Sequence, residues 1–96
     1  MSKRQTIQEN KQAILNIARA HGLVNVRIFG SVARGEDTPK SDIDFLVDLE
    51  TGRSLLDIGG ALMQLEQLLE RKVDIVKERG LHWYLRETIL KEAQAI

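Results

Sequence analysis

Three aspartates in this 96-residue chain are spaced so that their carboxylates could meet. Asp42 and Asp44 alternate with apolar residues, the pattern of a β-strand, so both side chains should project from one face with their Cα atoms about 7 Å apart. Asp74 lies in a second short apolar run of the same kind. Carboxylates that face one another repel unless a cation lies between them. If the two strands are neighbours, these aspartates form a cluster able to hold two Mg²⁺ ions roughly 3.5–4 Å apart and to drive in-line displacement at phosphorus.

A glycine and a serine lie where they could bind the phosphates of such a substrate. Gly30 and Ser31 follow a predicted strand and open a tight turn that ends at Gly35. Glycine lets backbone amides come close to an anion, and free amides beside a hydroxyl form a phosphate-binding cradle. Arg34, in the same turn, is placed to add charge-assisted hydrogen bonds to phosphate oxygens. We therefore predict that Gly30, Ser31 and Arg34 bind nucleotide phosphates.

Each of these features also has an ordinary structural explanation. A Gly-Ser pair before a polar loop is usually a turn, two aspartates at this spacing often end a strand in solvent, and Asp74 alone could be a solvated edge residue. A calcium-binding loop is excluded because Leu46 occupies the next acidic position of that motif. The combination of Gly-Ser, ten residues, the aspartate pair and a third acid inside an apolar strand is difficult to explain by structure alone, and it favours catalysis.

Three other polar residues have structural rather than catalytic interpretations. Asp48 shares the predicted face of Asp42 and Asp44 but lies further along the strand, where we expect it to end the strand or to support the acids rather than to bind metal. Asp57 is expected to cap a helix. His21 is expected near a helix C-terminus, where a partly positive imidazole is favourable.

The elements that must position the site alternate between helical and strand periodicity. This order predicts an α/β fold in which a small central sheet of three strands is covered by helices. The expected elements are a helix opened by a capping box at 6–9 and closed by Gly22, a strand at 24–29, the turn at 30–35, a loop at 36–41, a strand at 42–49, a helix from a capping box at 54–57 to Leu69, a strand at 72–77 and a helix at 82–95.

Finer expectations follow from the same patterns. Val24, Val26 and Ile28 should share one face of the first strand. Gly59 and Gly60 weaken the helix that contains them by about 1 kcal/mol each relative to alanine, so close packing is their expected reason.

The two ends of the chain carry a basic and an aromatic cluster. Lys3, Arg4 and Lys11 are expected to form a solvated tail. The aromatic cluster at 82–84 (His82, Trp83 and Tyr84) has two open interpretations, either partial core or a surface that meets a partner or stacks on a base.

Composition narrows the function further. Lysine plus arginine equals aspartate plus glutamate, at 14 each, so the chain lacks the broad positive field that drives non-specific nucleic-acid binding. The absence of cysteine excludes disulfides and thiolate metal sites. No signal-peptide pattern is present, and no apolar run approaches the ~20 residues that span a bilayer. We therefore expect a cytoplasmic protein that binds neither membrane nor nucleic acid.

The string GSVARGEDTPKSDIDFLVD, followed by KVDIV, resembles the signature of the DNA polymerase β-like nucleotidyltransferase superfamily. It is most similar to the smallest branch, the minimal nucleotidyltransferases. The similarity extends from the first predicted helix to Ile96, and residues 1–96 are expected to form a single minimal nucleotidyltransferase domain. The resemblance implies a mixed sheet with flanking helices and a Mg²⁺-dependent enzyme that uses ATP.

The same resemblance implies a role for each residue of the motif. Gly30 and Ser31 match positions that grip the triphosphate, and Arg34 matches a basic residue that contacts it. Asp42 and Asp44 match the acids that bind both metals. Asp74 matches the third acid, which holds the catalytic metal near the acceptor hydroxyl and helps to deprotonate it.

The resemblance also implies a partner. Minimal nucleotidyltransferases are typically antitoxins paired with a helical HEPN-domain ribonuclease toxin, and they silence it by transferring AMP from ATP to a tyrosine hydroxyl. We expect a complex with such a toxin, which would supply its own recognition surface because 96 residues leave little room for another. Two alternatives stay open: a catalytic subunit that nucleotidylates a small molecule such as an aminoglycoside, and a non-catalytic antitoxin that masks its toxin by binding.

Overall fold

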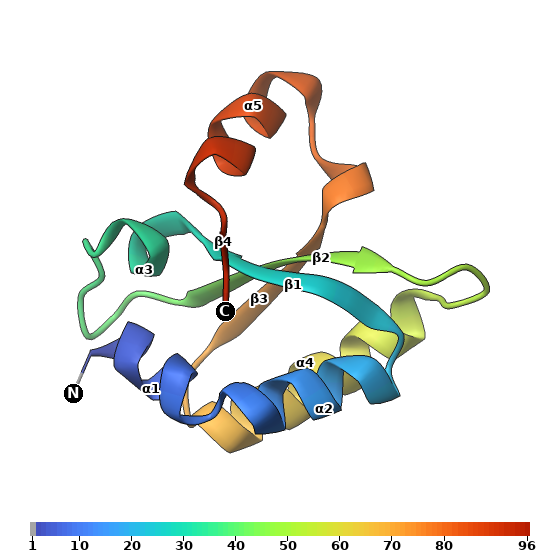
Figure 1. Cartoon of the computed structure of the whole chain (residues 1–96), viewed down its shortest axis with the longest axis horizontal. Coiled ribbons are helices and arrows are strands. Elements are labelled where there is room, and N and C mark those ends of the chain that lie inside the picture. Colours follow the sequence, from blue (N-terminus) through green and yellow to red (C-terminus); the bar gives the residue numbers. More distant parts are fainter. Residues whose placement is uncertain (1) are drawn as a thin grey trace.

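Four strands form a mixed sheet in the order β3-β2-β1-β4 (Figure 1). The structure is a computed structural model that describes residues 2–96. Strand β2 (Ile43–Leu49) runs parallel to β3 (Val73–Lys77) and antiparallel to β1 (Leu23–Phe29), which also pairs with the short β4 (Gln94–Ala95). This arrangement confirms the expected α/β fold with a small mixed sheet flanked by helices. The fourth strand was not predicted.

Helices lie on both sides of the sheet (Figure 1). In this view α1 (Lys3–Glu9), α2 (Lys11–Ala20) and α4 (Leu55–Leu69) lie below the strands and α5 (Trp83–Glu92) lies above them. The short α3 (Gly30–Arg34) follows β1, and the 3₁₀ helix η1 (Glu78–Gly80) follows β3. Within residues 2–96, every helix is too short or too polar to cross a membrane.

The hydrophobic core lies between the sheet and the helices α1, α2 and α4. Ile43, Phe45 and Val47 of β2 face this core and are at most 1% exposed, as their alternation predicted. Burying a side chain of this size stabilises the fold by about 1.5–3 kcal/mol. The helices contribute small and branched apolar side chains, namely Ile7, Ile14, Ala18, Ala61, Leu65 and Leu69. The intervening residues of β2, including its acids, therefore point to the opposite face of the sheet.

The N-terminal helix begins earlier than predicted and is interrupted at Asn10. Ser2 is its N-cap, and the Ser2 hydroxyl oxygen accepts a backbone hydrogen bond at 3.1 Å. Thr6 instead donates its hydroxyl to the Ser2 carbonyl at 3.1 Å, so the predicted capping box at 6–9 is wrong. The second helix ends where expected, because Gly22 adopts a φ of +74° after it.

A bulge in β1 breaks the alternation predicted for that strand. Asn25 has a φ of +53°, and the register with β2 shifts between Val24 and Arg27. Val24 is 42% exposed, whereas Ile28 is 2% exposed. The expectation that Val24 shares the buried face of Ile28 is therefore wrong, because the extra residue shifts the alternation so that Leu23, at 3% exposed, faces the core in place of Val24.

Helix α4 is capped as predicted. The Ser54 amide donates to the Asp57 carboxylate at 3.0 Å, and this bond lowers the pKa of Asp57. A Cβ on Gly60 would lie 2.7 Å from the His21 ring, so close packing explains this glycine and gives His21 a structural role. The same explanation is wrong for Gly59, because within residues 2–96 a Cβ there would meet nothing within 4 Å beyond its chain neighbours and the adjacent backbone of its own helix.

The last helix is shorter and more exposed than predicted. It ends at Glu92, and the chain then pairs with β1 as β4 instead of continuing as helix to residue 95. No residue of α5 is buried, and Trp83 and Tyr84 are 84% and 59% exposed. The core interpretation of the aromatic cluster at 82–84 is therefore wrong, and the surface interpretation is the one compatible with the fold.

Candidate active site

The structure brings the predicted acids together at one end of the sheet. Asp44 and Asp74 are paired residues of the parallel strands β2 and β3. Neighbouring strands lie about 4.8 Å apart, and paired residues project from the same face, so these two carboxylates are adjacent. Asp42 immediately precedes β2, two residues before Asp44. Asp42 and Asp44 are half-buried, and Asp74 is exposed.

The three carboxylates influence one another electrostatically. The pKa of Asp44 is raised from 3.8 to about 6, chiefly because the carboxyl is partly removed from water. Repulsion by Asp74 and then by Asp42 contributes further, while the guanidinium of Arg34 partly offsets these effects. Clustered carboxylates of this kind are stabilised by a bound cation, which reverses the sign of the local field.

Gly30 lies directly against this acid cluster. Phe29 pairs with Asp44 across β1 and β2, and Gly30 is the next residue. Its φ is +76°, and a Cβ at this position would collide with the Asp44 carboxylate. Both the left-handed backbone and the close approach therefore require glycine. Ser31 and Arg34 follow within α3, and Gly35, at a φ of +71°, ends this helix as the predicted turn requires.

Glu92 also belongs to this group of residues, although it was not predicted from the sequence. One of its carboxylate oxygens accepts a hydrogen bond from the Gly30 amide at 3.0 Å, and the other accepts one from Arg34 Nη1 at 2.8 Å. The bond to Glu92 is the main reason that the pKa of Arg34 is raised above its usual value. A sequence signal existed, because an anion in the last turn of a helix is unfavourable without a partner. The sequence does not show which residues are that partner, because Gly30 and Arg34 lie 62 and 58 positions away in the chain.

The loop that leads to Asp42 is attached to α1. Lys3 is only 6% exposed, and its Nζ donates to the Thr38 carbonyl at 2.5 Å and lies 3.8 Å from the Asp37 carboxylate. Ser41 closes the loop by accepting a hydrogen bond from the Thr38 amide at 2.8 Å. The expectation of a solvated basic tail is therefore wrong for Lys3, which holds the segment entering the acid strand.

The acids fit magnesium by the chemistry of their oxygens. Magnesium retains several waters and usually takes one or two carboxylates together with substrate phosphates. Among residues 2–96, no three Asp, Glu, His or Cys side chains enclose a metal by themselves. The donor set is therefore of the open kind that substrate phosphates complete, rather than a closed protein cage.

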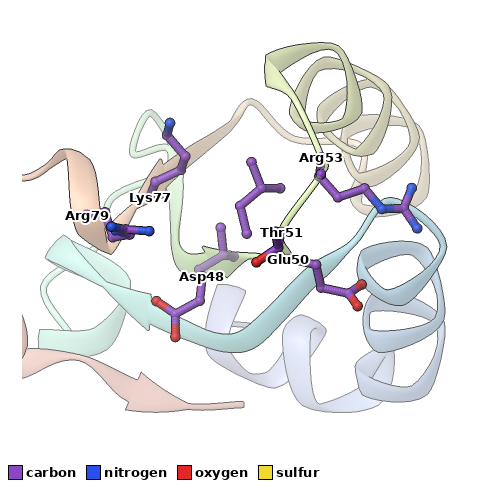
Figure 2. A pocket seen from close by; sticks show the side chains of 9 residues that line it. Asp48, Glu50, Thr51, Arg53, Lys77 and Arg79 are labelled. Atoms are coloured by element: carbon purple, nitrogen blue, oxygen red, sulfur yellow. The ribbon is translucent and has the colours of Figure 1, made fainter.

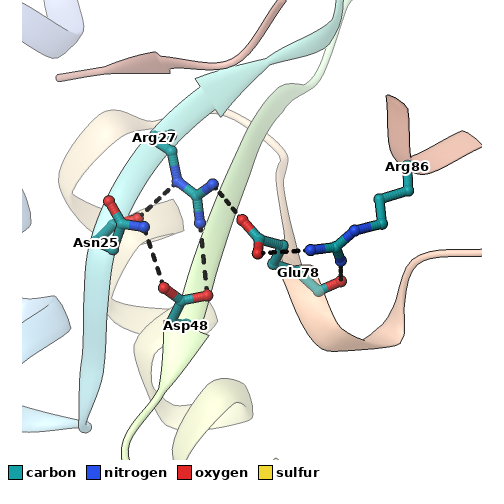
Figure 3. A network of polar contacts seen from close by, with 5 residues as sticks. All are labelled: Asn25, Arg27, Asp48, Glu78 and Arg86. Atoms are coloured by element: carbon teal, nitrogen blue, oxygen red, sulfur yellow. Dashed lines mark hydrogen bonds and ion pairs between the residues drawn. The ribbon is translucent and has the colours of Figure 1, made fainter. Parts of the chain in front are cut away.

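Asp48 lies outside this cluster and has structural contacts, as expected (Figure 3). It accepts a hydrogen bond from Asn25 at 3.0 Å and lies 3.6 Å from Arg27, whose side chain is 12% exposed. Arg27 also pairs with Glu78 at 2.6 Å, and this contact lowers the pKa of Glu78. Glu78 in turn pairs with Arg86 at 3.1 Å. The network therefore connects β1 and β2 to η1 and α5.

One surface pocket lies away from the predicted site. It has a volume of about 260 Å³ and lies at the other end of β2 (Figure 2). Its lining combines basic and acidic side chains and contains none of the predicted site residues; the labelled members are Asp48, Glu50, Thr51, Arg53, Lys77 and Arg79. The carboxylates that converge, and the glycine turn beside them, lie at the end of β2 opposite this pocket, so the acid cluster is the candidate active site.

Comparison with known proteins identifies the family of this chain. The nucleotidyltransferase domain family matches residues 10–96, a range that contains the acids and the Gly-Ser turn. A Methanocaldococcus jannaschii protein named "putative protein adenylyltransferase" is 41% identical over 87 residues, which cover 91% of this chain and 94% of that protein. Protein adenylyltransferase MntA of Thermococcus cleftensis is 39% identical over 71 residues, which cover 74% of this chain and 72% of that protein.

Solved structures share the fold. One described as a "putative minimal nucleotidyltransferase" is 48% identical, with a TM-score of 0.89, and covers 100% of this chain and 97% of that chain. A toxin–antitoxin complex with AMP-PNP has a chain that is 23% identical, with a TM-score of 0.75 over 90% of this chain and 71% of that one, and it shares the fold. The expected resemblance is confirmed: this chain belongs to the nucleotidyltransferase domain family and has the architecture of a minimal nucleotidyltransferase.

Proposed function

We propose that this chain is a magnesium-dependent protein adenylyltransferase that transfers AMP from ATP to a tyrosine hydroxyl of a HEPN-domain toxin and so acts as its antitoxin. The observation that carries the proposal is the pairing of Asp44 with Asp74 on parallel strands, directly beside Gly30. The names of the relatives support AMP transfer to a protein, and a fold neighbour solved with a toxin and AMP-PNP supports a nucleotide and a toxin partner.

In this proposal the phosphate-binding residues come from the turn after β1. The Gly30 amide and the Ser31 hydroxyl donate to phosphate oxygens, and Arg34 adds charge-assisted hydrogen bonds. The glycine at position 30 lets the triphosphate approach the acids closely, because a side chain there would occupy the same space as the Asp44 carboxylate. These residues orient the α-phosphorus toward the acid cluster.

The acid cluster performs the second part of the reaction. Asp42, Asp44 and Asp74 would hold Mg²⁺, which supplies positive charge against the triphosphate during the displacement. The acceptor oxygen attacks the α-phosphorus, the bond between that phosphorus and the bridging oxygen breaks, and pyrophosphate leaves. Asp74, the most exposed of the three acids, faces the incoming acceptor and receives the proton of its hydroxyl.

The acceptor is proposed to be a protein in a complex with this chain. A partner that docks beside the exposed Asp74 presents its own hydroxyl to the site, so that binding and orientation come from the partner's surface. The reaction consumes ATP, and we accordingly place this protein in the cytoplasm.

Intact mass spectrometry tests the proposal. The chain is incubated with ATP, MgCl₂ and a HEPN-domain toxin, and the toxin should gain one or more AMP units on tyrosine. Asp42→Asn, Asp44→Asn and Asp74→Asn should each lower the rate by about 10³-fold or more, because each removes a ligand of the cation that offsets the charge of the transition state. Asp48→Asn is the matched control on the same strand and should retain transfer, since Asp48 contacts Arg27 instead.

The same assay distinguishes the alternatives. Modification of an aminoglycoside without modification of the partner would support a small-molecule nucleotidyltransferase. Neutralisation of the toxin that survives in the Asp42→Asn, Asp44→Asn double variant would support masking by binding alone. A double variant with the wild-type transfer rate would remove the metal-binding roles assigned to these acids.

A further inference from the structure

Glu92 makes the contacts that a substrate phosphate would make at the predicted cradle. Its carboxylate bridges the Gly30 amide, at 3.0 Å, and Arg34 Nη1, at 2.8 Å. A backbone amide and a guanidinium are the same two donors that the proposed function gives to the triphosphate. Each hydrogen of these donors can serve a carboxylate oxygen or a phosphate oxygen, but not both at full strength.

The position of Glu92 in its helix explains why these contacts matter. Glu92 is the last residue of α5, where the helix dipole disfavours a negative charge. Its side chain is nevertheless only 18% exposed, whereas Glu87 of the same helix is 81% exposed. The contacts to Gly30 and Arg34 therefore hold a carboxylate that would otherwise extend into water.

Release of Glu92 requires little change in the fold. The chain beyond α5 is fixed independently, because Gln94 and Ala95 pair with β1 and Ile96 is 8% exposed. The start of α5 is attached by Arg86, which donates to the Glu78 carboxylate at 3.1 Å (Figure 3). A rotation of the Glu92 side chain alone would free both donors while these attachments remain.

We infer that Glu92 is an internal competitor of the nucleotide: its carboxylate occupies the phosphate-binding donors Gly30 and Arg34 and must leave them before the triphosphate binds. This inference rests on the proposed function of those donors. Glu92 is thus a residue that sets the affinity for nucleoside triphosphate, rather than one that takes part in the transfer. Competition raises the apparent dissociation constant by the inverse of the fraction of molecules in which the donors are free.

Calorimetric titration with inorganic tripolyphosphate and with ATP plus MgCl₂ tests the inference. If the donors are free in roughly one molecule in five, Glu92→Gln should bind both probes about fivefold more tightly than the wild type. Glu92→Asp keeps the charge but shortens the reach to the donors, so it should also tighten binding. Because Glu92→Asp keeps the negative charge, tighter binding by this variant would show that the wild-type side chain occupies the donors. A loss of negative charge at the site could not explain it.

Glu36→Gln is the matched control. Glu36 contacts the same guanidinium, at 3.2 Å from Arg34 Nε, but does not contact the Gly30 amide. Its removal takes away the same charge and should change affinity by less than about twofold, since an exposed ion pair contributes little. In an Arg34→Ala background, Glu92→Gln should increase the affinity for the probes by a smaller factor. The reason is that Arg34, one of the two donors for which Glu92 and the phosphate compete, is absent.

The outcomes separate this inference from the proposed function. Suppose that the wild type binds ATP and transfers AMP, but that both Glu92 variants bind the probes no more tightly than the wild type. This result overturns the competitor role and leaves the proposed function intact. Equal tightening by Glu36→Gln also overturns it, because the effect would then be one of charge alone. If neither the wild type nor Glu92→Gln binds either probe, both the competitor role and the proposed function are overturned. Circular dichroism of each variant establishes that the comparison is made between folded proteins.

Discussion

Replacing Asp44 by asparagine should stabilise the protein at neutral pH in the absence of divalent cations. The folded protein binds the Asp44 proton more tightly than the unfolded chain does, because the pKa of this carboxyl is raised from 3.8 to about 6. Its favourable contribution to folding is therefore complete below about pH 4 and is lost as the pH rises through about 6. Asparagine carries no charge at any of these values, so the variant avoids that loss.

The magnitude follows from the difference between the two pKa values. At 1.36 kcal/mol per pKa unit, a carboxyl with a pKa of about 6 instead of 3.8 destabilises the folded state by up to about 3 kcal/mol at neutral pH. Asp44 is only half-buried, so water screens part of this penalty, and we reduce the expected gain to about 1–1.5 kcal/mol. For a domain of this size each kcal/mol corresponds to a rise in melting temperature of about 4–8 °C.

Urea denaturation at pH 7.5 and at pH 4, in EDTA, measures the effect. Asp44→Asn should raise the free energy of unfolding at pH 7.5, and most of the difference should disappear at pH 4, where wild-type Asp44 is protonated. Asp48→Asn is the control on the same strand and should lower stability, because it removes the partner of the nearly buried Arg27. A variant that is less stable than the wild type at pH 7.5, or a gain that persists at pH 4, would refute the raised pKa of Asp44.

Three further predictions concern the cation, the helix glycines and the loop before the acids. MgCl₂ at about 100 times its dissociation constant should stabilise the wild type by about 2.7 kcal/mol in thermal unfolding, and Asp44→Asn should lose most of that gain. Gly60→Ala should lower the free energy of unfolding by about 1–3 kcal/mol because its methyl group meets His21, whereas Gly59→Ala should raise it by up to about 1 kcal/mol; equal effects would contradict the packing at Gly60. Lys3→Ala should cost about 1 kcal/mol and speed proteolysis of the loop at 36–41, and an unchanged cleavage rate would show that Lys3 does not fix that loop.

The parts predicted from the sequence are those that depend on local pattern. The alternation in β2 assigned Phe45 to the core and Asp44 to the opposite face, and both assignments agree with the structure. The capping residues of α4 and the glycine that closes α2 were also identified correctly, because a cap depends on residues within one turn. The sequence predicts a cluster of aspartates only if β3 lies beside β2. The parallel pairing of these two strands meets that condition.

The parts that were missed depend on distant residues. Strand β4 has two residues and is defined by its pairing with β1, so it carries no periodicity of its own. Glu92 acquires its role from Gly30, 62 positions earlier in the chain, and Lys3 acquires its role from Thr38, 35 positions later. For a charged residue near a terminus or on an exposed helix, the neighbouring sequence does not indicate whether the side chain is solvated or has a specific partner.

The register between β2 and β3 determines whether the acids can meet. Val73 is 4% exposed and faces the core, while its neighbour Asp74 points to the other face and pairs with Asp44. A slip of β3 by one residue would turn Asp74 into the core and Val73 into water, and burial of an unpaired carboxylate is far more costly than any gain in pairing. A slip of two residues would keep the face but move Asp74 by about 7 Å along the strand, away from its position opposite Asp44. The apolar residues that build the core thus also set the distance between the carboxylates, so a core substitution that shifts β3 should impair transfer without touching an acid.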